Sequence, residues 1–457
     1  MQKAIRDLTK GNLWKQIILF SLPLMASNLL QVVFHMADTS VVGHFAGAAA
    51  LGSVGSTTTL ITFFTWFIVG MSFGVNALVA QNIGARDNKS LEKSVHSAAI
   101  ICFAMGILLF LIGFIFARDI LELLGTKEDL IDDAVLYFKI YMLGMPGAAI
   151  YNFGNAVLSA AGDTKRPLVY LTISGAVNIV LNLFLVIVCD MGVAGVGIAT
   201  TVSLYISAIL ILIALLRSNE AFKLCFSKLG LDAYASKKII GLGITTGLQY
   251  SLFSVANLFI QSGVNTFETV VVEGNSAAIN MDNFVYDALN AIYAAATSFV
   301  GQNYGARNKK RILHSYLICL IYSFGLAAIM GSALCVFGRQ FLSLFTSEAA
   351  VIEAGLIRVQ IMGLTICTSS LMDCAVSASR GLGKTVMPTI FVGLGVCVFR
   401  ILWIYTIFAH FHTMAALYLL YVFSWVITGT CEISYFFYTY KKITKDMVPL
   451  QHGAIAQ

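Results

Sequence analysis

The chain has 457 residues, of which 58% are hydrophobic and only 11% are charged. Soluble globular domains carry roughly 25% charged residues, so this composition excludes a soluble enzyme or binding domain and indicates a polytopic membrane protein. The net charge of +6 does not indicate a nucleic-acid partner, because the basic residues are spread over the loops between hydrophobic stretches.

Hydrophobic stretches long enough for the ~20 residues that cross a bilayer recur from Trp14 almost to Tyr440. We therefore predict an all-α integral membrane protein with twelve transmembrane helices. The predicted ranges, in chain order, are 14–41, 50–80, 92–117, 131–160, 167–189, 194–216, 238–264, 272–302, 312–337, 354–379, 387–409 and 413–439.

The distribution of basic residues indicates the topology. If the N-terminus is cytoplasmic, most of the 29 lysines and arginines fall in the N-terminal segment, the internal loops or the C-terminal tail, as the positive-inside rule requires. The opposite loops are acidic, most clearly residues 119–133. We predict a multi-pass protein of the inner or plasma membrane with both termini in the cytoplasm.

One six-helix unit is present twice. The motif Gln81-Asn82-Ile83-Gly84-Ala85-Arg86, at the end of the second predicted helix, recurs as Gln302-Asn303-Tyr304-Gly305-Ala306-Arg307 at the end of the eighth. The same register relates Gly162 to Gly383 and Pro167 to Pro388, which chance does not explain. We interpret the motif as a helix C-cap followed by a cytoplasmic arginine.

The domain organisation that follows from this repeat has five parts. They are a cytoplasmic N-terminus (1–13), an N-lobe (14–216), a cytoplasmic linker with an amphipathic helix (217–237), a C-lobe (238–440) and a cytoplasmic C-terminal tail (441–457).

The first predicted helix contains a proline and a charge. Pro23 removes a backbone hydrogen bond and is expected to kink the helix. Asp38 lies near the outer helix end and shares a face with Gln31 and His35. Because a carboxylate inside a membrane costs roughly 2.5–3.5 kcal/mol, Asp38 is expected to face a wet cavity or to carry a proton. The alternative is an interfacial aspartate that caps the helix or snorkels.

Other polar side chains follow helical spacing. Asn178 and Asn182 share a face of the fifth predicted helix and Thr200 lies in the sixth; their oxygens suit a cation shell, or they join helices by hydrogen bonds. Longer polar stripes in the second half are expected to line a water-filled lobe. They contain Tyr250, Ser254, Asn257, Gln261 and Asn265 on the seventh helix, Ser276, Asn280, Asn283, Asp287 and Asn290 on the eighth, and Ser369, Asp373 and Ser377 on the tenth.

The nine cysteines are scattered and none forms a C-x-x-C pair, so we interpret them as small buried hydrophobic residues. The sequence contains no zinc-ligand spacing, phosphate-binding loop or nucleophile elbow. We predict no cofactor, and no metal other than a sodium ion at Asp38.

These features together resemble the multidrug and toxic compound extrusion (MATE) transporters of the bacterial type. The resemblance covers residues 12–440, nearly the whole chain. The motifs that carry it are the repeated Gln-Asn-x-Gly-Ala-Arg, Asp38-Thr39-Ser40-Val41-Val42-Gly43, Asn178-Ile179-Val180-Leu181-Asn182, Gly192-Val193-Ala194-Gly195 with Ala199-Thr200, Gly247-Leu248-Gln249, and Arg380-Gly381-Leu382-Gly383.

The resemblance implies two lobes arranged in a V and the export of small cationic amphiphilic drugs in antiport with protons or sodium. It places Asp38, Asn178, Asn182 and Thr200 in a cation or proton site of the N-lobe. Many relatives have an aspartate where this chain has Asn182, which leaves Asp38 as the only carboxylate of that cluster. The substrate cavity is predicted to contain Gln31, Phe34, Asn155, Gln249, Asn257, Gln261, Asn283, Asp287 and Asp373.

We therefore predict an antiporter that confers drug and antibiotic resistance, is a monomer in the lipid bilayer, and is not an enzyme. One alternative is a lipid or lipid-linked oligosaccharide flippase of the same superfamily, which is expected to have a cationic cavity; here Arg400 is the main basic residue. The other alternative is a membrane-embedded enzyme, which would turn over a substrate without an ion gradient.

Overall fold

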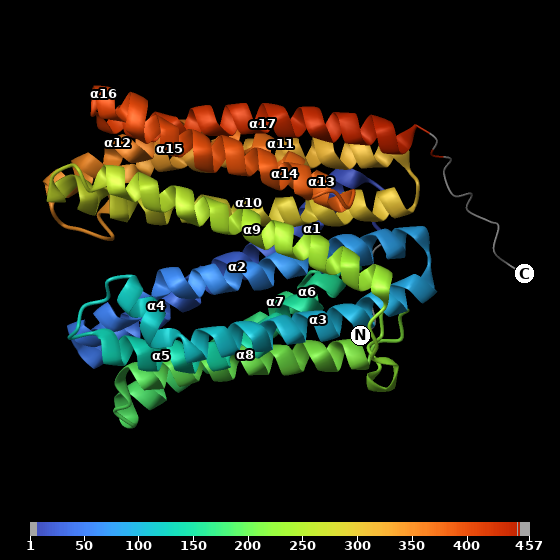
Figure 1. The fold of residues 1–457 in the computed structure, drawn as a ribbon, viewed down its shortest axis with the longest axis horizontal. Coiled ribbons are helices and arrows are strands. Elements are labelled where there is room, and N and C mark those ends of the chain that lie inside the picture. The colour runs from blue at the N-terminus through green and yellow to red at the C-terminus, as the bar shows by residue number, and fades with distance from the viewer. Residues whose placement is uncertain (1–6, 446, 448–457) are drawn as a thin grey trace, which may run out of the picture. The chain divides into compact units, whose positions relative to one another are not determined.

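The computed structural model describes residues 7–445 and residue 447, so the predicted terminal segments 1–13 and 441–457 lie partly outside the described residues. Described residues of the first half form α-helices with short π and 3₁₀ turns (Figure 1). The elements are α1 (Leu13–Val41), a π turn (Val42–Ala46), α2 (Gly47–Ala85), α3 (Asn88–Ile115), α4 (Ala117–Leu123), α5 (Ile131–Leu143), α6 (Met145–Ala160), α7 (Lys165–Leu183), a π turn (Phe184–Val188), α8 (Gly192–Leu216) and a 3₁₀ turn (Phe226–Lys228).

The second half follows the same pattern. Its elements are α9 (Ala233–Val264), α10 (Thr269–Gly305), α11 (Lys309–Leu342), α12 (Ala349–Thr365), a 3₁₀ turn (Ile366–Thr368), α13 (Ser369–Gly381), α14 (Val386–Val392), a π turn (Gly393–Val398), α15 (Phe399–Trp403), a π turn (Ile404–Phe408), α16 (Ala409–Phe411) and α17 (Met414–Thr444).

The predicted fold class is confirmed, because each of the twelve predicted ranges coincides with a helical segment. Among the described residues, ten helices are long and apolar enough to cross a membrane, and the pair α5 and α6 makes an eleventh. That pair bends by 42° where one straight span was predicted, because Gly144 and Pro146 interrupt it. α10 has 37 residues but is not among these spans, because its polar side chains lower its hydropathy.

The sequence repeat is also a repeat of backbone conformation. After α2 and α10 the chain adopts the left-handed conformation at Arg86 (φ 56°) and Arg307 (φ 54°). The next helix then begins with a capping side chain in both halves: Asp87 accepts from the Ser90 N–H at 2.9 Å, and Asn308 accepts from the Arg311 N–H at 3.2 Å. The bond from Ser90 lowers the pKa of Asp87. The motif therefore ends one helix and starts the next.

The chain divides into two compact units, and each boundary falls inside a helix. Unit 1 contains Ala26–Gly247, whereas unit 2 contains Asp7–Met25 and the chain from Leu248 onward. α1 therefore begins in unit 2 and continues into unit 1 just after Pro23, while α9 begins in unit 1 and continues into unit 2. The lobe ranges 14–216 and 238–440 stay a prediction.

Within unit 1, α7 packs along α8, and α6 contacts α2, α3 and α8. The first half of α9 is joined to α2 through glycines: a Cβ atom at Gly70 would lie 2.5 Å from the backbone nitrogen of Gly247. At Gly74, a Cβ atom would lie 2.9 Å from the backbone nitrogen of Gly243. The two helices therefore approach as closely as glycine allows, which is how apolar helices gain packing contacts when lipid is the solvent.

Within unit 2, α10 contacts α11, α12 and α13, and α17 packs along α13 (Figure 1). The centre of this unit contains large, fully buried side chains, among them Phe299, Tyr316 and Trp425. Aromatic and aliphatic side chains together form this core, so individual polar groups here have to find partners on neighbouring helices.

The linker before α9 differs from its prediction. The expected amphipathic helix is a single 3₁₀ turn, because Phe222 and Leu224 are buried in the core of unit 1 instead of forming an apolar face. Ion pairs hold the linker to the start of α3, with Lys93 2.9 Å from Asp232 and Lys228 2.7 Å from Glu92.

In unit 2 the segment before α1 is held in a comparable way. The Leu8 N–H donates to Gln302 Oε1 at 3.1 Å, and the Leu8 side chain is fully buried. The Arg311 guanidinium donates to three backbone carbonyls, those of Leu8 at 3.1 Å, Lys10 at 3.2 Å and Gly11 at 2.8 Å. Arg311 therefore ties the chain before α1 to α11.

We expect Arg311→Ala to release this segment, because three charge-assisted hydrogen bonds to its carbonyls are lost. Hydrogen exchange of the amides of residues 7–12 should become faster, while exchange in the middle of α11 stays slow. Lys310→Ala, a change at the exposed neighbouring residue, is the matched control. Equal exchange in all three proteins would show that Arg311 does not hold the segment.

Candidate functional site

Three helices of unit 1 bring the predicted cation-site residues together. Asp38 comes from α1, Asn178 and Asn182 from α7, and Thr200 from α8. The Asn182 amide donates to Asp38 Oδ1, and the Thr200 hydroxyl donates to Asp38 Oδ2 at 3.2 Å. Asn178 completes the arrangement by accepting from the Asn182 amide at 3.4 Å and donating to Thr200 Oγ1 at 3.4 Å. The four side chains form a closed ring of hydrogen bonds.

The position of this ring of hydrogen bonds depends on close packing between α1 and α7. A Cβ atom at Gly175 would lie 2.0 Å from the ring of Phe34, so glycine alone leaves room for the phenylalanine. Phe34 is four residues before Asp38 and therefore lies on the same face of α1. Gly175 is seven residues before Asn182 and therefore lies on the same face of α7. The aromatic contact therefore sets the distance at which Asp38 meets Asn182.

Both helices leave regular α geometry beside the ring. The π turn Val42–Ala46 begins four residues after Asp38, and the π turn Phe184–Val188 begins two residues after Asn182. The two π turns contact each other. π turns are frequent at functional sites, and here they adjoin the half-buried carboxylate of Asp38.

One acceptor in the ring is not used. Asn178 and Asn182 are 4% and 1% exposed, and Asn182 Oδ1 has no hydrogen-bond partner among the described residues. A buried acceptor without a donor is costly, so it indicates a position where a donor or a cation binds. The carboxylate, the two amide oxygens and the hydroxyl together offer oxygen atoms only, which are the ligands of hard cations such as sodium.

Two other predicted residues of unit 1 lie outside this ring. The Gln31 side chain is exposed and donates to the Ser27 carbonyl of its own helix at 3.5 Å. Asn155 is half-buried and accepts from the Ser159 hydroxyl at 3.3 Å. Their assignment to a substrate cavity stays a prediction.

The predicted cavity residues of unit 2 differ in their surroundings. Gln249 is 2% exposed and accepts from Arg380 Nη2 at 3.0 Å, so it joins α9 to α13 inside the unit. Gln261 donates to Asn265 at 2.9 Å and accepts from Asn275 at 3.4 Å. The remaining residues are Asn257 and Asn283, which are exposed, and Asp287 and Asp373, which are half-buried.

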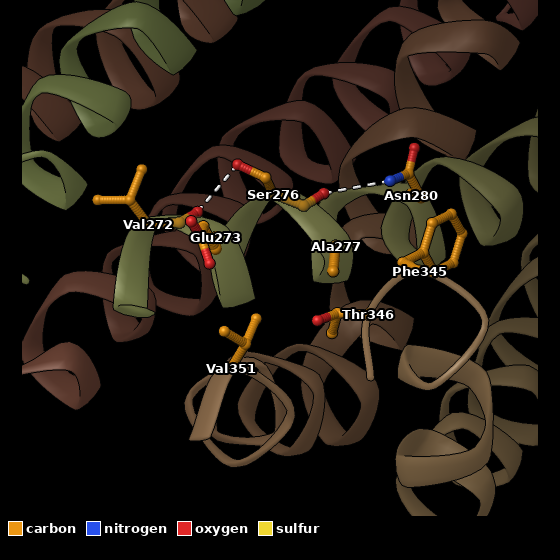
Figure 2. A pocket seen from close by; sticks show the side chains of 8 residues that line it. All are labelled: Val272, Glu273, Ser276, Ala277, Asn280, Phe345, Thr346 and Val351. Carbon is orange, nitrogen blue, oxygen red and sulfur yellow. Dashed lines mark hydrogen bonds between the residues drawn. The ribbon is translucent and has the colours of Figure 1, made fainter. Parts of the chain in front are cut away.

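Unit 2 also contains a pocket of about 390 Å³ at the start of α10. Figure 2 shows Glu273, Ser276 and Asn280 along one side of α10, with the segment after α11 and the start of α12 opposite. Ser276 and Asn280 bond to carbonyls of their own helix, at 2.9 and 3.2 Å. This volume suits a small molecule, but none of the residues predicted for the substrate cavity lines the pocket, and only Ser276 and Asn280 come from the polar stripes noted in the sequence. Its lining residues are Val272, Glu273, Ser276, Ala277, Asn280, Phe345, Thr346 and Val351.

Comparison with known proteins identifies the family. The sequence profile of the MatE family matches the chain twice, over residues 23–184 and 246–406, so both halves carry the family pattern. The chain belongs to the MATE family. It is 30% identical over 350 residues to the probable multidrug resistance protein YpnP of Bacillus subtilis, covering 76% of this chain and 78% of that protein.

The chain is also similar to a transporter with a named substrate and to a solved structure. A protein of Shewanella oneidensis named FAD transporter is 21% identical over 358 residues, covering 77% of this chain and 78% of that protein. The crystal structure of a MATE transporter in complex with MaD3S superimposes with a TM-score of 0.89 at 20% identity, covering 97% of this chain and all of the other. The family match and the apolar helices indicate a multi-pass plasma-membrane protein of a transporter family that acts on small molecules.

The MATE transporter contains an intramembrane ion pair that sequence reasoning missed. Asp282 of α10 and Arg358 of α12 are 7% and 4% exposed, and Arg358 donates twice to Asp282 Oδ2, at 3.0 and 2.7 Å. Arg358 also donates to Asn275 at 2.8 Å, and Asn275 accepts from the Tyr418 hydroxyl at 3.1 Å. Opposite charges inside two predicted spans were the signal that could have revealed this pair.

Two further buried ionisable residues lie in the same unit of the transporter. Arg400 of α15 donates to the Ser424 hydroxyl at 3.0 Å, and its guanidinium lies 4.5 Å from the centre of the Tyr421 ring. Arg400 also interacts electrostatically with Asp373. Glu432 of α17, which the sequence reasoning did not consider, is fully buried. The position of this acidic residue inside a predicted transmembrane helix could have revealed it from the sequence.

We expect Asp282→Asn to destabilise the transporter by about 3–5 kcal/mol, because the Arg358 guanidinium would remain buried without its counter-charge. Reversible unfolding of the detergent-purified protein measures this. Glu353→Gln is the control, since Glu353 pairs with Arg339 where both side chains are more than half exposed and such pairs contribute about 0–1 kcal/mol. Equal stability of the two variants would contradict the structural role of the pair.

Proposed function

We propose that this MATE transporter is a secondary-active multidrug exporter that moves cationic amphiphilic compounds out of the cell in antiport with protons or sodium. The observation that carries the proposal is the hydrogen-bond ring at Asp38, in which a carboxylate inside an apolar helix bundle receives one donor on each oxygen. Such a group changes its partners when it binds a proton or a cation, and can therefore couple ion binding to a change of conformation.

In the ring as it stands, Asn182 and Thr200 both direct hydrogens at Asp38. A proton added to Asp38 turns one of its oxygens into a donor, which then opposes one of these two donors. The Thr200 hydroxyl has to rotate, or the Asn182 amide has to turn its unpaired oxygen toward the acid. After protonation, Asp38 of α1 donates a hydrogen bond and a group of α7 or α8 accepts it.

A sodium ion would act on the same atoms. It would replace the donated hydrogens by contacts to the Asp38 carboxylate, the Asn182 oxygen and the Thr200 hydroxyl. A single carboxylate gives the site one negative charge, so either a proton or a monovalent cation neutralises it. The proposal therefore covers both coupling ions, and an experiment with separate gradients distinguishes them.

Coupling to the rest of the transporter runs through α1. Its N-terminal part belongs to unit 2 and its C-terminal part, with Asp38, belongs to unit 1, and Pro23 lies beside the change. A change of bonding at Asp38 therefore acts on a helix shared by both units. Because Pro23 has no backbone N–H, α1 lacks one backbone hydrogen bond at this position and bends more easily there.

The proposed substrate class rests on the side chains one and two turns before Asp38. Phe34 offers an aromatic face for a flat cation and Gln31 offers amide groups, while Asp38 supplies the negative charge when it has released its ion. The name of the Bacillus relative agrees with drug export. The ionic pairing of Arg358 with Asp282 neutralises one of the buried arginines of unit 2, which argues against the cationic cavity expected of a flippase.

We propose further that the protein works as a monomer with both termini in the cytoplasm. This orientation places the Arg86 and Arg307 turns, the linker and the segment held by Arg311 on the cytoplasmic side. The excess of lysine and arginine in these segments supports it.

We expect Asp38→Asn to reduce ion-driven export of ethidium to the level of cells without the transporter, because the residue can no longer bind or release an ion. Asp190→Asn, at an exposed aspartate of a loop, is the matched control and should keep full export. Membrane insertion is measured in both variants. Full export by a correctly inserted Asp38→Asn variant would remove Asp38 from the mechanism.

We expect Asn182→Ala to change the affinity for the coupling ion about tenfold or more, because hydrogen bonds to charged groups contribute about 1.5–3 kcal/mol each. The affinity for a proton should increase, since the variant loses a hydrogen bond that stabilises the Asp38 carboxylate, whereas the affinity for sodium should decrease, since the Asn182 oxygen is lost as a ligand. Uptake into proteoliposomes, with proton and sodium gradients imposed separately, gives this affinity and identifies the ion. An unchanged ion dependence in the Asn182 variant would show that the ring is only structural.

A further inference from the structure

Glu432 is a buried acid that the Asp38 mechanism does not use. It lies inside α17, its side chain is 0% exposed, and neither of its carboxyl oxygens has a hydrogen-bond partner among the described residues. An ionised carboxylate in such a position costs several kcal/mol unless a donor or an opposite charge contacts it. Asp282 in the same unit has such a contact with Arg358, whereas Glu432 does not.

The surroundings of Glu432 along α17 are tightly packed. One turn earlier, Thr428 is also buried and its hydroxyl has no partner among the described residues. A Cβ atom at Gly395 would lie 2.1 Å from that hydroxyl, so α17 and the π turn Gly393–Val398 are in close contact. One turn later, Phe436 packs against Tyr316 with ring centres 4.2 Å apart. Little space remains for a solvated anion.

The charged groups that interact with Glu432 are Arg380 and Asp373, both on α13, the helix that packs along α17. Gln249 accepts a hydrogen bond from Arg380 at 3.0 Å, and the Arg380 guanidinium lies 5.6 Å from the centre of the Tyr250 ring. Two tyrosines contact Phe436, the buried Tyr316 on α11 and Tyr440 on α17. Arg400 on α15 donates to Ser424, which lies eight residues before Glu432 on α17. Glu432 thus interacts electrostatically with one positive and one acidic side chain of α13.

We propose that Glu432 is a second proton-binding residue of this transporter, located in unit 2. In the described arrangement its carboxyl group carries the proton, and a neutral acid needs no counter-ion. When the proton leaves for water, the O–H bond breaks and the remaining carboxylate is compensated by the positive charge of Arg380. The role of this proton in transport rests on the proposed antiport function, but its binding to Glu432 does not.

The binding can be tested on the full-length protein in liposomes with dicyclohexylcarbodiimide. This apolar reagent adds to a protonated carboxylic acid in an apolar environment and leaves a stable acylurea, which peptide mass spectrometry assigns to a residue. The reaction is run over a range of pH on the wild-type chain, on Glu432→Gln and on the matched control Glu353→Gln, which replaces an exposed glutamate. Infrared spectra of the same samples report the carbonyl band of a protonated acid.

We expect the reagent to label the peptide that contains Glu432 when the reaction is run at low pH. Less label should form in reactions run at higher pH, and none should form on this peptide in Glu432→Gln. The carbonyl band of a protonated acid should be reduced in that variant and unchanged in Glu353→Gln. No label on Glu432, with no loss of the band, would show an ionised structural glutamate and overturn the proposal. A label that persists unchanged at every pH would overturn it as well, since such a proton is never exchanged.

Transport assays then separate this inference from the proposed function. If the transporter exports drugs, Glu432→Gln should flatten the dependence of export on pH, whereas Glu353→Gln keeps it. If neither the wild-type chain nor the two variants show ion-driven export, the proposed function fails. The labelling result still decides whether Glu432 binds a proton. Export by Glu432→Gln with the pH dependence of the wild type would show that the proton is not coupled.

Discussion

An acid inside a bundle of apolar helices has to be hydrogen-bonded, paired with a cation or protonated, because lipid and hydrocarbon side chains cannot solvate its charge. This transporter contains such acids in three different environments. Among the described residues, Asp38 receives donors from Asn182 and Thr200, Asp282 is paired with Arg358, and Glu432 has neither a hydrogen bond nor an ion pair. How each acid is neutralised decides what it can do, so the chemistry of the molecule follows from these three environments.

The three environments differ in how easily they exchange an ion. The Asp282–Arg358 pair is closed by two hydrogen bonds and surrounded by tyrosines, so it joins helices and is poorly suited to release a charge. The partners of the Asp38 carboxylate are neutral groups that can reverse their hydrogen bonds, and Asn182 Oδ1 accepts no hydrogen bond from the described residues. An ion site needs this adaptability, because the ligand has to leave as well as to bind.

The two halves of the chain share their helix caps, but they do not share these three acids. Both halves end their second helix with a left-handed arginine and begin the next helix with a capping side chain. However, each compact unit includes half of a helix from the other repeat, since α1 and α9 change unit part-way along their length. α1, which contains Asp38, has residues in both units, and Pro23 lies beside the position where it changes unit.

The sequence by itself determined the class of the protein, its repeat and its helices, because hydropathy over ~20 residues and a fixed register are local properties of a chain. It also singled out Asp38, Asn178, Asn182 and Thr200, since polar residues are conspicuous in apolar spans. Only the tertiary structure decided that Gly175 admits Phe34, that Gln249 is bound to Arg380, and that Asp282 and Glu432 differ in their partners. These facts depend on contacts between residues far apart in the chain, and the spacing along one helix contains no information about the side chain that faces it from another.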